Sequence, residues 1–413
     1  MSKKLRNRLI ALFCLLAFAA AGFLFYTNWV VQKPFAIILF IGDGLTPGTL
    51  TPARIYENGA HNRLSLEHLP NLALLTTYAN DFAVPDAAAA ASAIATGRKV
   101  NNRSLAMDAA GKPLTSLLDL AQKSGRSVGL VSNASLTDST LAAFYAKSSD
   151  PLNHSDLALQ LLRTEPDVAL GGGLADFLPE SKEGSRTDGR DLILEMRRSG
   201  YDIVRTRGEM LEIPAWRAPR ILGLFAPGNL DYADIAGGSG PQPLLSDLVR
   251  KAIQLLQYNP QGYFLVVDAG LITKAAHANE GERVLREMIE LDRAVATALS
   301  YAGENALIIV TGKQSVGGLR MNGFPFKNDR GISVIGTNPQ GIPSITWSTG
   351  PGGNVAPASP DAPQQPIEPA AVGAPAAIGI AEDVIAVSKG PGSERLQGFK
   401  DNTEIFKVIS SQL

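Results

Sequence analysis

Short apolar segments that stop at polar or small residues are the feature of this sequence that most restricts its fold. Four of them are Phe35–Ile41, Val128–Val131, Tyr263–Val267 and Ala306–Val310. Apolar runs of this length, bounded by turn residues, are typical of strands that are buried on both faces. The sequence therefore predicts a sheet that is covered on both sides.

Helical patterns lie between these predicted strands. In Leu114–Lys123 the apolar residues fall at i, i+3, i+4 and i+7, which is one helix face. Similar patterns occur in Leu157–Leu162, Leu245–Leu256 and Glu282–Leu299. Strands that alternate with helices predict an α/β fold, a three-layer sandwich with a central, mostly parallel sheet.

In such folds the functional site lies at the C-terminal ends of the strands. Polar side chains follow the predicted strands at four places: Asp43, Ser132–Thr140, Asp268–His277 and Thr311–Ser315. The chemistry of this protein is therefore expected in these segments.

The N-terminus has the pattern of a membrane signal. Basic residues in positions 1–8 precede 23 uncharged residues, Leu9–Val31, which are long enough as a helix to cross a bilayer. The basic tail is expected in the cytoplasm, so residues 33–413 would lie on the extracytoplasmic, periplasmic or outer, side. Cleavage of a signal peptide after Ala19–Ala21 is the alternative, but it would leave an apolar tail, so an uncleaved anchor is favoured.

Charge and cysteine content exclude several classes of protein. The 413 residues contain 38 Lys and Arg against 39 Asp and Glu, and this balance argues against a nucleic-acid partner. The single cysteine, Cys14, excludes an intrachain disulfide and a Cys-rich zinc module. Only four histidines are present, which limits any zinc chemistry.

Motifs across most of the chain resemble those of the alkaline phosphatase family. In chain order they are Ile37–Gly44, Val84–Asp86 with Ala93–Gly97, Val131–Ala134, Thr137–Thr140, Ala143–Ala146, Leu170–Gly173, Val267–Gly270, His277–Asn279, Gly390–Glu394 and Asp401–Ile405. The resemblance implies a phosphomonoesterase with two Zn²⁺ ions, one Mg²⁺ ion, a nucleophilic serine and a phosphate-clamping arginine. It also implies a homodimer.

The implied nucleophile is missing. The family's serine directly follows the aspartate that matches Asp86, and here that position is Ala87. Residues 88–91 are also alanine, while Ser92 and Thr96 lie more than a helical turn away. A methyl group cannot be phosphorylated, so we expect no covalent catalysis of the family type. The clamping arginine is absent too, because Asp150 stands near its place.

Most of the implied zinc ligands are also missing. In the first site Thr273 replaces an aspartate, Gly379 stands near the position of a histidine, and only His277 remains. In the second site Lys313-Gln314 replaces an Asp-His pair, which leaves Asp43. A catalytic zinc usually has three protein ligands, so Zn²⁺ binding is not expected. We expect Lys313 to pair with Asp43 where zinc would stand, although a lysine facing solvent is the alternative.

More of the ligands of the implied magnesium site are present in this sequence than of the implied zinc sites. Asp43, Thr140 and Asp268 match its oxygen ligands, and Asp138 matches an outer-shell acid. Asp268 replaces a glutamate, but Mg²⁺ readily keeps waters, so a water could fill the gap. The alternative is a hydrogen-bonded polar pocket without metal.

Residues 351–377 contain seven prolines and predict an extended or mobile loop. Three functions remain open. The favoured one is a membrane-anchored, catalytically inactive member of the family that binds or scaffolds an unknown protein or ligand. The second is an active Mg²⁺-only hydrolase, and the third is a structural envelope protein that works through the Pro-rich loop.

Overall fold

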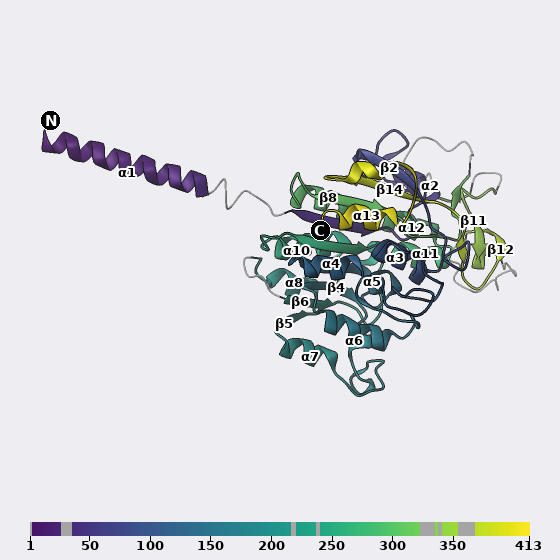
Figure 1. The fold of residues 1–413 in the computed structure, drawn as a ribbon. Coiled ribbons are helices and arrows are strands. Elements are labelled where there is room, and N and C mark those ends of the chain that lie inside the picture. Colours follow the sequence, from purple (N-terminus) through teal and green to yellow (C-terminus); the bar gives the residue numbers. More distant parts are fainter. Residues whose placement is uncertain are drawn as a thin grey trace. The chain divides into compact units, whose positions relative to one another are not determined.

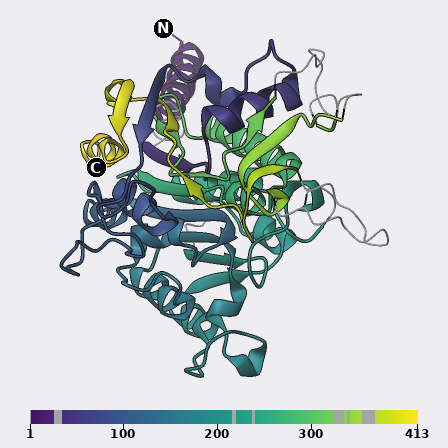
Figure 2. The same cartoon turned by 90° about the vertical axis from the view of Figure 1, so that its right-hand side faces the viewer.

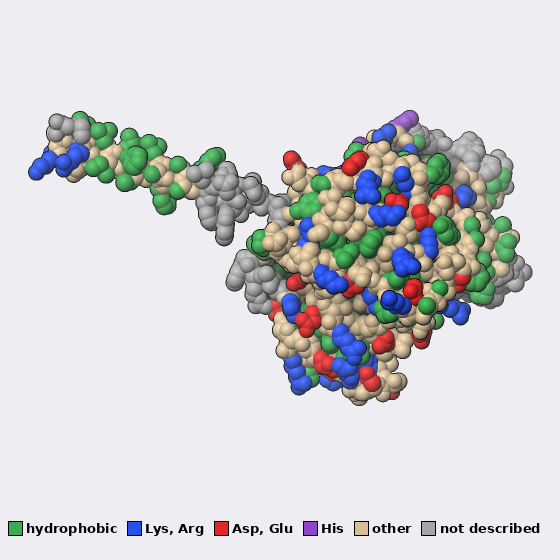
Figure 3. Space-filling model, in the orientation of Figure 1, with side chains coloured by type: hydrophobic (Ala, Val, Ile, Leu, Met, Phe, Trp, Pro, Cys, Tyr) green, Lys and Arg blue, Asp and Glu red, His purple; other side chains and the backbone are tan. Residues whose placement is uncertain are grey.

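The computed structural model describes residues 2–25, 35–215, 220–236, 240–322, 335–337, 341–353 and 368–413. The chain divides into two units, Met1–Pro34 and Phe35–Leu413. In the first unit the helix α1 covers Lys3–Phe25, and its residues Lys3–Phe23 are long and apolar enough to cross a membrane. Figure 3 shows apolar side chains along this helix and basic side chains at its free end. The last residues of the predicted span, 26–31, lie outside the described residues.

The second unit is built on one large sheet with the strand order β15-β2-β14-β8-β1-β7-β3-β4-β6-β5. All of its strand pairs are parallel except those of β14, which runs antiparallel to β2 and β8. The bounds of these strands are β1 Ala36–Ile41, β2 Asn71–Thr76, β3 Ser127–Ser135, β4 Val168–Gly172, β5 Tyr201–Val204, β6 Arg220–Leu224, β7 Tyr263–Asp268, β8 Leu307–Thr311, β14 Val384–Lys389 and β15 Gly398–Asp401.

Helices cover both faces of this sheet. Their bounds are α2 Pro47–Asn58, α3 Ala87–Thr96, α4 Leu117–Lys123, α5 Ser139–Tyr145, α6 His154–Thr164, α7 Leu192–Arg198, α8 Arg207–Glu212, α9 Ala233–Ala236, α10 Leu245–Leu256, α11 Leu271–His277, α12 Gly281–Tyr301 and α13 Glu404–Ser410. In Figure 1 α3, α4, α5 and α13 lie in front of the sheet.

The central strand β1 explains why the sheet needs two covering layers. All six of its residues are buried. Its side chains alternate, so that Ile38 and Phe40 belong to the core under α10 and α12, while Ile37 and Leu39 belong to the core under α3–α5. The structure is the three-layer α/β sandwich that the sequence predicts.

Two smaller sheets follow β8. One has the order β10-β11-β12, with bounds Arg320–Met321, Ile345–Gly350 and Ala370–Gly373, and the other pairs β9 Ser315–Val316 with β13 Gly379–Ile380. Figures 1 and 2 show β11 and β12 at the end of the molecule where the parallel strands finish. Within the predicted Pro-rich loop, residues 354–367 lie outside the described residues, whereas β12 is an ordered strand that pairs with β11.

One predicted helix begins later than expected. The periodicity of Leu114–Lys123 suggested a start at Leu114, but α4 begins at Leu117. The Ser116 side chain accepts a hydrogen bond from the Asp119 amide and caps the helix. Capping chemistry therefore sets this boundary and leaves Leu114 outside the helix.

Candidate functional site

Three neighbouring strands bring the predicted site residues together. β1 lies between β7 and β8, and Ile41 is in register with Asp268 on one side and Thr311 on the other. Asp43 follows β1 by two residues, and Lys313 follows β8 by two residues. Chain segments more than 200 residues apart thus end at the same edge of the sheet.

Lys313 and Asp43 form a buried ion pair at this edge. The side chains of Lys313 and Asp43 are only 2% and 6% exposed, and Lys313 Nζ lies 2.7 Å from Asp43 Oδ2. This contact confirms the predicted pairing and excludes the solvent-facing alternative. Lys313 Nζ also donates a hydrogen bond of 2.6 Å to Thr140 Oγ1 on α5, a contact that the sequence did not predict.

Gly312 allows Lys313 to reach this position. A Cβ atom at residue 312 would lie 2.6 Å from the Leu45 carbonyl oxygen and 2.7 Å from the Val384 Cβ atom. The Gly312 amide also donates a hydrogen bond to the Ile385 carbonyl. The residue before Lys313 therefore has to be glycine for the chain to pass between β1 and β14.

Asp268 is the most deeply buried acid of the site, with no exposed surface. Its Oδ2 accepts a hydrogen bond of 2.8 Å from Ser132 Oγ, and its Oδ1 has no hydrogen-bond partner among the described residues. Burial raises the pKa of Asp268 to about 7, and the nearby Asp43 adds to this effect while Lys313 opposes it. Asp268 therefore carries a proton for much of the time near neutral pH.

Asp138 is paired with a second lysine. Its Oδ1 accepts from the Ser139 amide at the start of α5, and its Oδ2 lies 2.7 Å from Lys274 Nζ on α11. Burial alone would raise the pKa of Asp138, but the ammonium groups of Lys274 and Lys313 outweigh it and hold the pKa below its ordinary value. The sequence did not predict this role of Lys274, although the residue lies directly after Thr273 in the segment Asp268–His277 where the site was expected.

These residues as they stand do not fit a divalent metal ion. Asp43 Oδ2 and Thr140 Oγ1, two of the predicted magnesium ligands, both contact the Lys313 ammonium. An ammonium group has no lone pair to give a metal. In the part of the chain that the structure describes, no group of three or more His, Cys, Asp or Glu side chains is arranged to hold a metal ion.

The residues at the positions of the implied first zinc site make hydrogen bonds and packing contacts with the backbone and with neighbouring side chains. Thr273 Oγ1 donates to the Asp43 carbonyl at 3.0 Å, and His277 Nδ1 lies 2.6 Å from the Ala377 carbonyl oxygen. Gly379 lies beside the segment before α3, because a Cβ atom there would be 3.2 Å from Val84 Cγ1. His277 thus helps to fix the segment that returns from the small sheets.

Ala87 is the first residue of α3. The preceding Asp86 caps the helix, because its Oδ1 accepts from the Ala89 amide and its Oδ2 from the Arg103 amide. The nearest hydroxyl on the helix, Ser92, accepts a hydrogen bond from the Ala106 amide. Thr96 donates its hydroxyl to the Ser92 carbonyl, so both hydroxyls point away from residue 87, as predicted.

Asp150 does not provide an anion clamp. It is exposed, and its Oδ1 accepts a hydrogen bond from the Leu152 amide within the same turn. A carboxylate at this place would repel a phosphate group.

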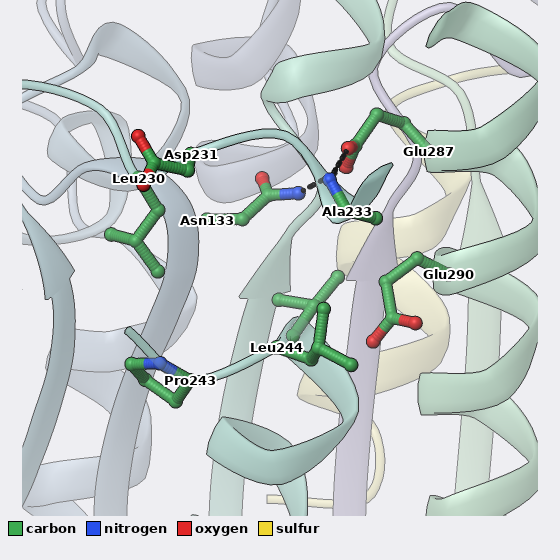
Figure 4. Close-up of a pocket in the computed structure, with 9 residues that line it drawn as sticks. Asn133, Leu230, Asp231, Ala233, Pro243, Leu244, Glu287 and Glu290 are labelled. Carbon is green, nitrogen blue, oxygen red and sulfur yellow. Dashed lines mark hydrogen bonds between the residues drawn. The ribbon is translucent and has the colours of Figure 1, made fainter. Parts of the chain in front are cut away.

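A small pocket lies beside β3, and Figure 4 shows it between Asn133, Leu244, Glu287 and Glu290. Glu287 Oε1 accepts from the Ala233 amide and its Oε2 from Asn133 Nδ2, while burial raises the pKa of Glu287 to about 8. The free volume is about 10 Å³, which is room for one water molecule at most. This pocket is too small for a substrate, and of its lining residues only Asn133 lies in a segment where the sequence predicted the site.

Several known proteins are similar to this chain. The sequence profile of the family described as alkaline phosphatase matches residues 35–413. The human tissue-nonspecific alkaline phosphatase is 29% identical over 437 aligned positions, which cover 91% of this chain and 82% of that protein. The membrane-bound alkaline phosphatase of Bombyx mori is 30% identical, with 77% of this chain and 67% of that protein covered.

A solved structure has a similar fold. It is a variant of the alkaline phosphatase of the Antarctic bacterium TAB5, with Mg bound in a site called M3. Its TM-score to this chain is 0.73 at 23% sequence identity, and the match covers 92% of this chain and 98% of that one. This likeness concerns the fold alone.

Proposed function

The chain belongs to the alkaline phosphatase family, and from that premise we propose that it keeps the family fold without phosphate-ester hydrolysis. Its role would then be to bind or scaffold another molecule. The observation that carries this proposal is Ala87 at the start of α3, the position that the sequence motif assigns to the nucleophile. Residues 88–91 present only buried methyl groups behind it.

The contacts around Lys313 support the same proposal. An active site that used only Mg²⁺ would need Asp43 or Asp138 to activate a water, with Lys313 free to hold an anion. Lys313 is instead paired with Asp43, and Asp138 is paired with Lys274. A carboxylate that is held by an ammonium is a weak general base, because the ion pair lowers its affinity for a proton.

The first experiment is hydrolysis of a chromogenic phosphate monoester by the purified full chain in detergent, with Mg²⁺ and Zn²⁺ added. An Asp43→Ala variant serves as the control for contaminating phosphatase. We expect equal, background rates for parent and variant. Turnover that the Asp43→Ala change abolishes would overturn the proposal in favour of an active hydrolase.

We also propose that α1 anchors the protein in a membrane, with residues 35–413 on the extracytoplasmic side. The basic residues Lys3, Lys4 and Arg6 precede its apolar part, and basic flanks stay in the cytoplasm. The Bombyx mori relative is described as membrane-bound, which agrees with an anchor. Alkaline carbonate extraction tests this point, as does protease treatment of cells from which any outer barrier has been removed while the cytoplasmic membrane stays intact. Release into the soluble fraction, or protection from protease under these conditions, would contradict it.

A homodimer is the further expectation that the family brings, and light scattering of the detergent-purified full chain tests it. The bound protein or ligand partner is not identified by any contact in the molecule. Near-equal numbers of acidic and basic residues argue against nucleic acid as that partner. Red and blue side chains are interspersed on the face of the second unit in Figure 3.

A further inference from the structure

We infer that the Lys313 ammonium is a built-in replacement for a metal ion, so that this edge of the sheet is complete without a divalent cation. The family resemblance implies metal ions held by Asp43, Thr140 and neighbouring residues. In this chain the same oxygen atoms, Asp43 Oδ2 and Thr140 Oγ1, lie 2.7 Å and 2.6 Å from Lys313 Nζ. The inference concerns metal binding, and it stands whether or not the chain hydrolyses esters.

The Lys313 ammonium and a divalent metal ion cannot occupy this site at the same time. Mg²⁺ requires oxygen ligands at about 2.0–2.1 Å in near-octahedral geometry. An ammonium within hydrogen-bond distance of both Asp43 and Thr140 fills the space in which such an ion would have to sit. A dication at the same oxygens would also be repelled strongly by the buried Lys313 charge.

The charges explain why a cation must be present. The Asp43 side chain is 6% exposed and follows a buried strand, so its carboxylate cannot obtain full hydration. A buried carboxylate without a partner is costly, and a metal ion or an ammonium group can remove this cost. Lys313 comes from the chain itself, its side chain is 2% exposed, and it supplies the charge in every folded molecule.

Two buried oxygens show what should happen when the lysine is removed. Asp43 Oδ1 and Asp268 Oδ1 have no hydrogen-bond partner among the described residues. Without Lys313, Asp43 Oδ2 and Thr140 Oγ1 would be free to offer oxygen ligands, Asp268 Oδ1 is already unpaired among the described residues, and waters could complete the shell. The Lys313→Ala variant is therefore expected to gain a Mg²⁺ site that the parent lacks.

The test uses the purified full chain in detergent, with bound metal measured by elemental analysis and thermal unfolding followed in EDTA, Mg²⁺ or Zn²⁺. We expect the parent to contain little divalent metal and to have the same melting temperature in all three conditions. We expect Lys313→Ala to melt earlier in EDTA, to recover with Mg²⁺, and to bind about one Mg²⁺ per chain.

Lys99→Ala is the matched control. Lys99 Nζ lies 3.1 Å from Asp401 Oδ2 and 2.7 Å from Asn402 Oδ1, so it also joins a mostly buried ion pair with a second polar contact. This variant should melt earlier than the parent in EDTA and should not recover with Mg²⁺. Recovery of both variants would show a general effect of Mg²⁺ and would overturn the inference.

Three further outcomes decide the case, and the first of them does not depend on whether a variant folds. A parent that loses melting temperature in EDTA and regains it with Mg²⁺ would overturn the inference without any variant. A Lys313→Ala chain that matches the parent in stability and binds no metal would also overturn it. A Lys313→Asp chain that folds only with added Mg²⁺ or Zn²⁺ would support it. These measurements report metal content and melting temperature rather than turnover. A positive hydrolysis assay would therefore overturn the proposed function without deciding this inference.

Discussion

Lys313 and Asp43 pair at 2.7 Å across the ends of β8 and β1, and both side chains are almost fully buried. The attraction between the two charges offsets the free-energy cost of removing each of them from water. The family resemblance implies a carboxylate at the position of residue 313, so we expect the sign of the charge at this position to be reversed. That reversal would distinguish this site from the one that the family resemblance implies.

The ion pair predicts a strong coupling between residues 43 and 313. Asp43→Ala removes the ion-pair partner of the buried Lys313 and leaves Thr140 as its hydrogen-bond partner among the described residues, so it should cost about 3–5 kcal/mol of unfolding free energy. The double variant Asp43→Asn with Lys313→Met removes both charges and should lose much less. Urea unfolding of the single and double variants measures the difference. A double variant whose loss equals the sum of the two single losses would contradict the coupling.

The raised pKa of Asp268 predicts that stability falls as the pH rises from about 4 to about 7. In this window the folded protein keeps the proton of Asp268 and the unfolded chain releases it, so raising the pH favours unfolding. The shift of about three pH units corresponds to a loss of roughly 4 kcal/mol, which is then constant at higher pH.

Asp268→Asn removes this titration and can still accept the hydrogen bond from Ser132. Its stability relative to the parent should therefore improve between about pH 5 and about pH 8. Urea unfolding at the two pH values gives the comparison. Glu287 has a raised pKa of about 8 and titrates in both proteins, so only the difference between them reports on Asp268. Parallel pH profiles would count against a protonated Asp268.

The sequence predicted β1 and β7 closely because burial on both faces leaves a clear signal, whereas β3 continues through Ser132–Ser135, beyond the predicted end at Val131. The predicted strand Phe35–Ile41 differs from β1 by one residue, and Tyr263–Val267 differs from β7 by one. β14 was not among the predicted strands, and its antiparallel direction was not predictable either, because an apolar run does not indicate whether it pairs parallel or antiparallel. The strand with which a segment pairs, and the direction of that pairing, depend on the topology of the whole chain and not on the local sequence.

The site was predictable to the extent that its chemistry follows from charge. A lysine that replaces a carboxylate beside Asp43 suggested their pairing, and the structure has it. The contact between Lys313 and Thr140 joins residues 173 positions apart on β8's end and α5, so no local pattern could indicate it. Glu287 was missed for a similar reason, because its partners Asn133 and Ala233 come from other elements.

Gly379 predicts that the first zinc site cannot be rebuilt by restoring one histidine. A Cβ atom at residue 379 would lie 3.2 Å from Val84 Cγ1, so Gly379→Ala should cost under about 1 kcal/mol and Gly379→His about 1–3 kcal/mol. Zn²⁺ should not raise the melting temperature of the histidine variant, because Thr273 is not a carboxylate and the site would hold fewer than the three protein ligands that a catalytic zinc usually has.

Gly228→His is the control for that substitution. Gly228 is exposed, and a Cβ atom there has nothing within 4 Å. Thermal unfolding with and without Zn²⁺ compares the two histidine variants. Stabilisation of Gly379→His alone by Zn²⁺ would mean that the ligands can still assemble around residue 379.

Ala87 predicts that a nucleophile alone does not restore hydrolysis. Ala87→Ser places a hydroxyl at the first position of α3, where the change should alter stability by no more than about 0.5 kcal/mol. The new hydroxyl would have no metal ion to lower its pKa and no arginine to hold a phosphoryl group. The rate of phosphate monoester hydrolysis should therefore stay at the parent's level, and mass spectrometry should find no phosphate on residue 87.

Ala88→Ser is the control, because residue 88 is buried one position further along the same helix. A hydrolysis rate well above that of both the parent and this control would mean that the surrounding residues still activate a serine. A phosphorylated Ala87→Ser chain would mean the same.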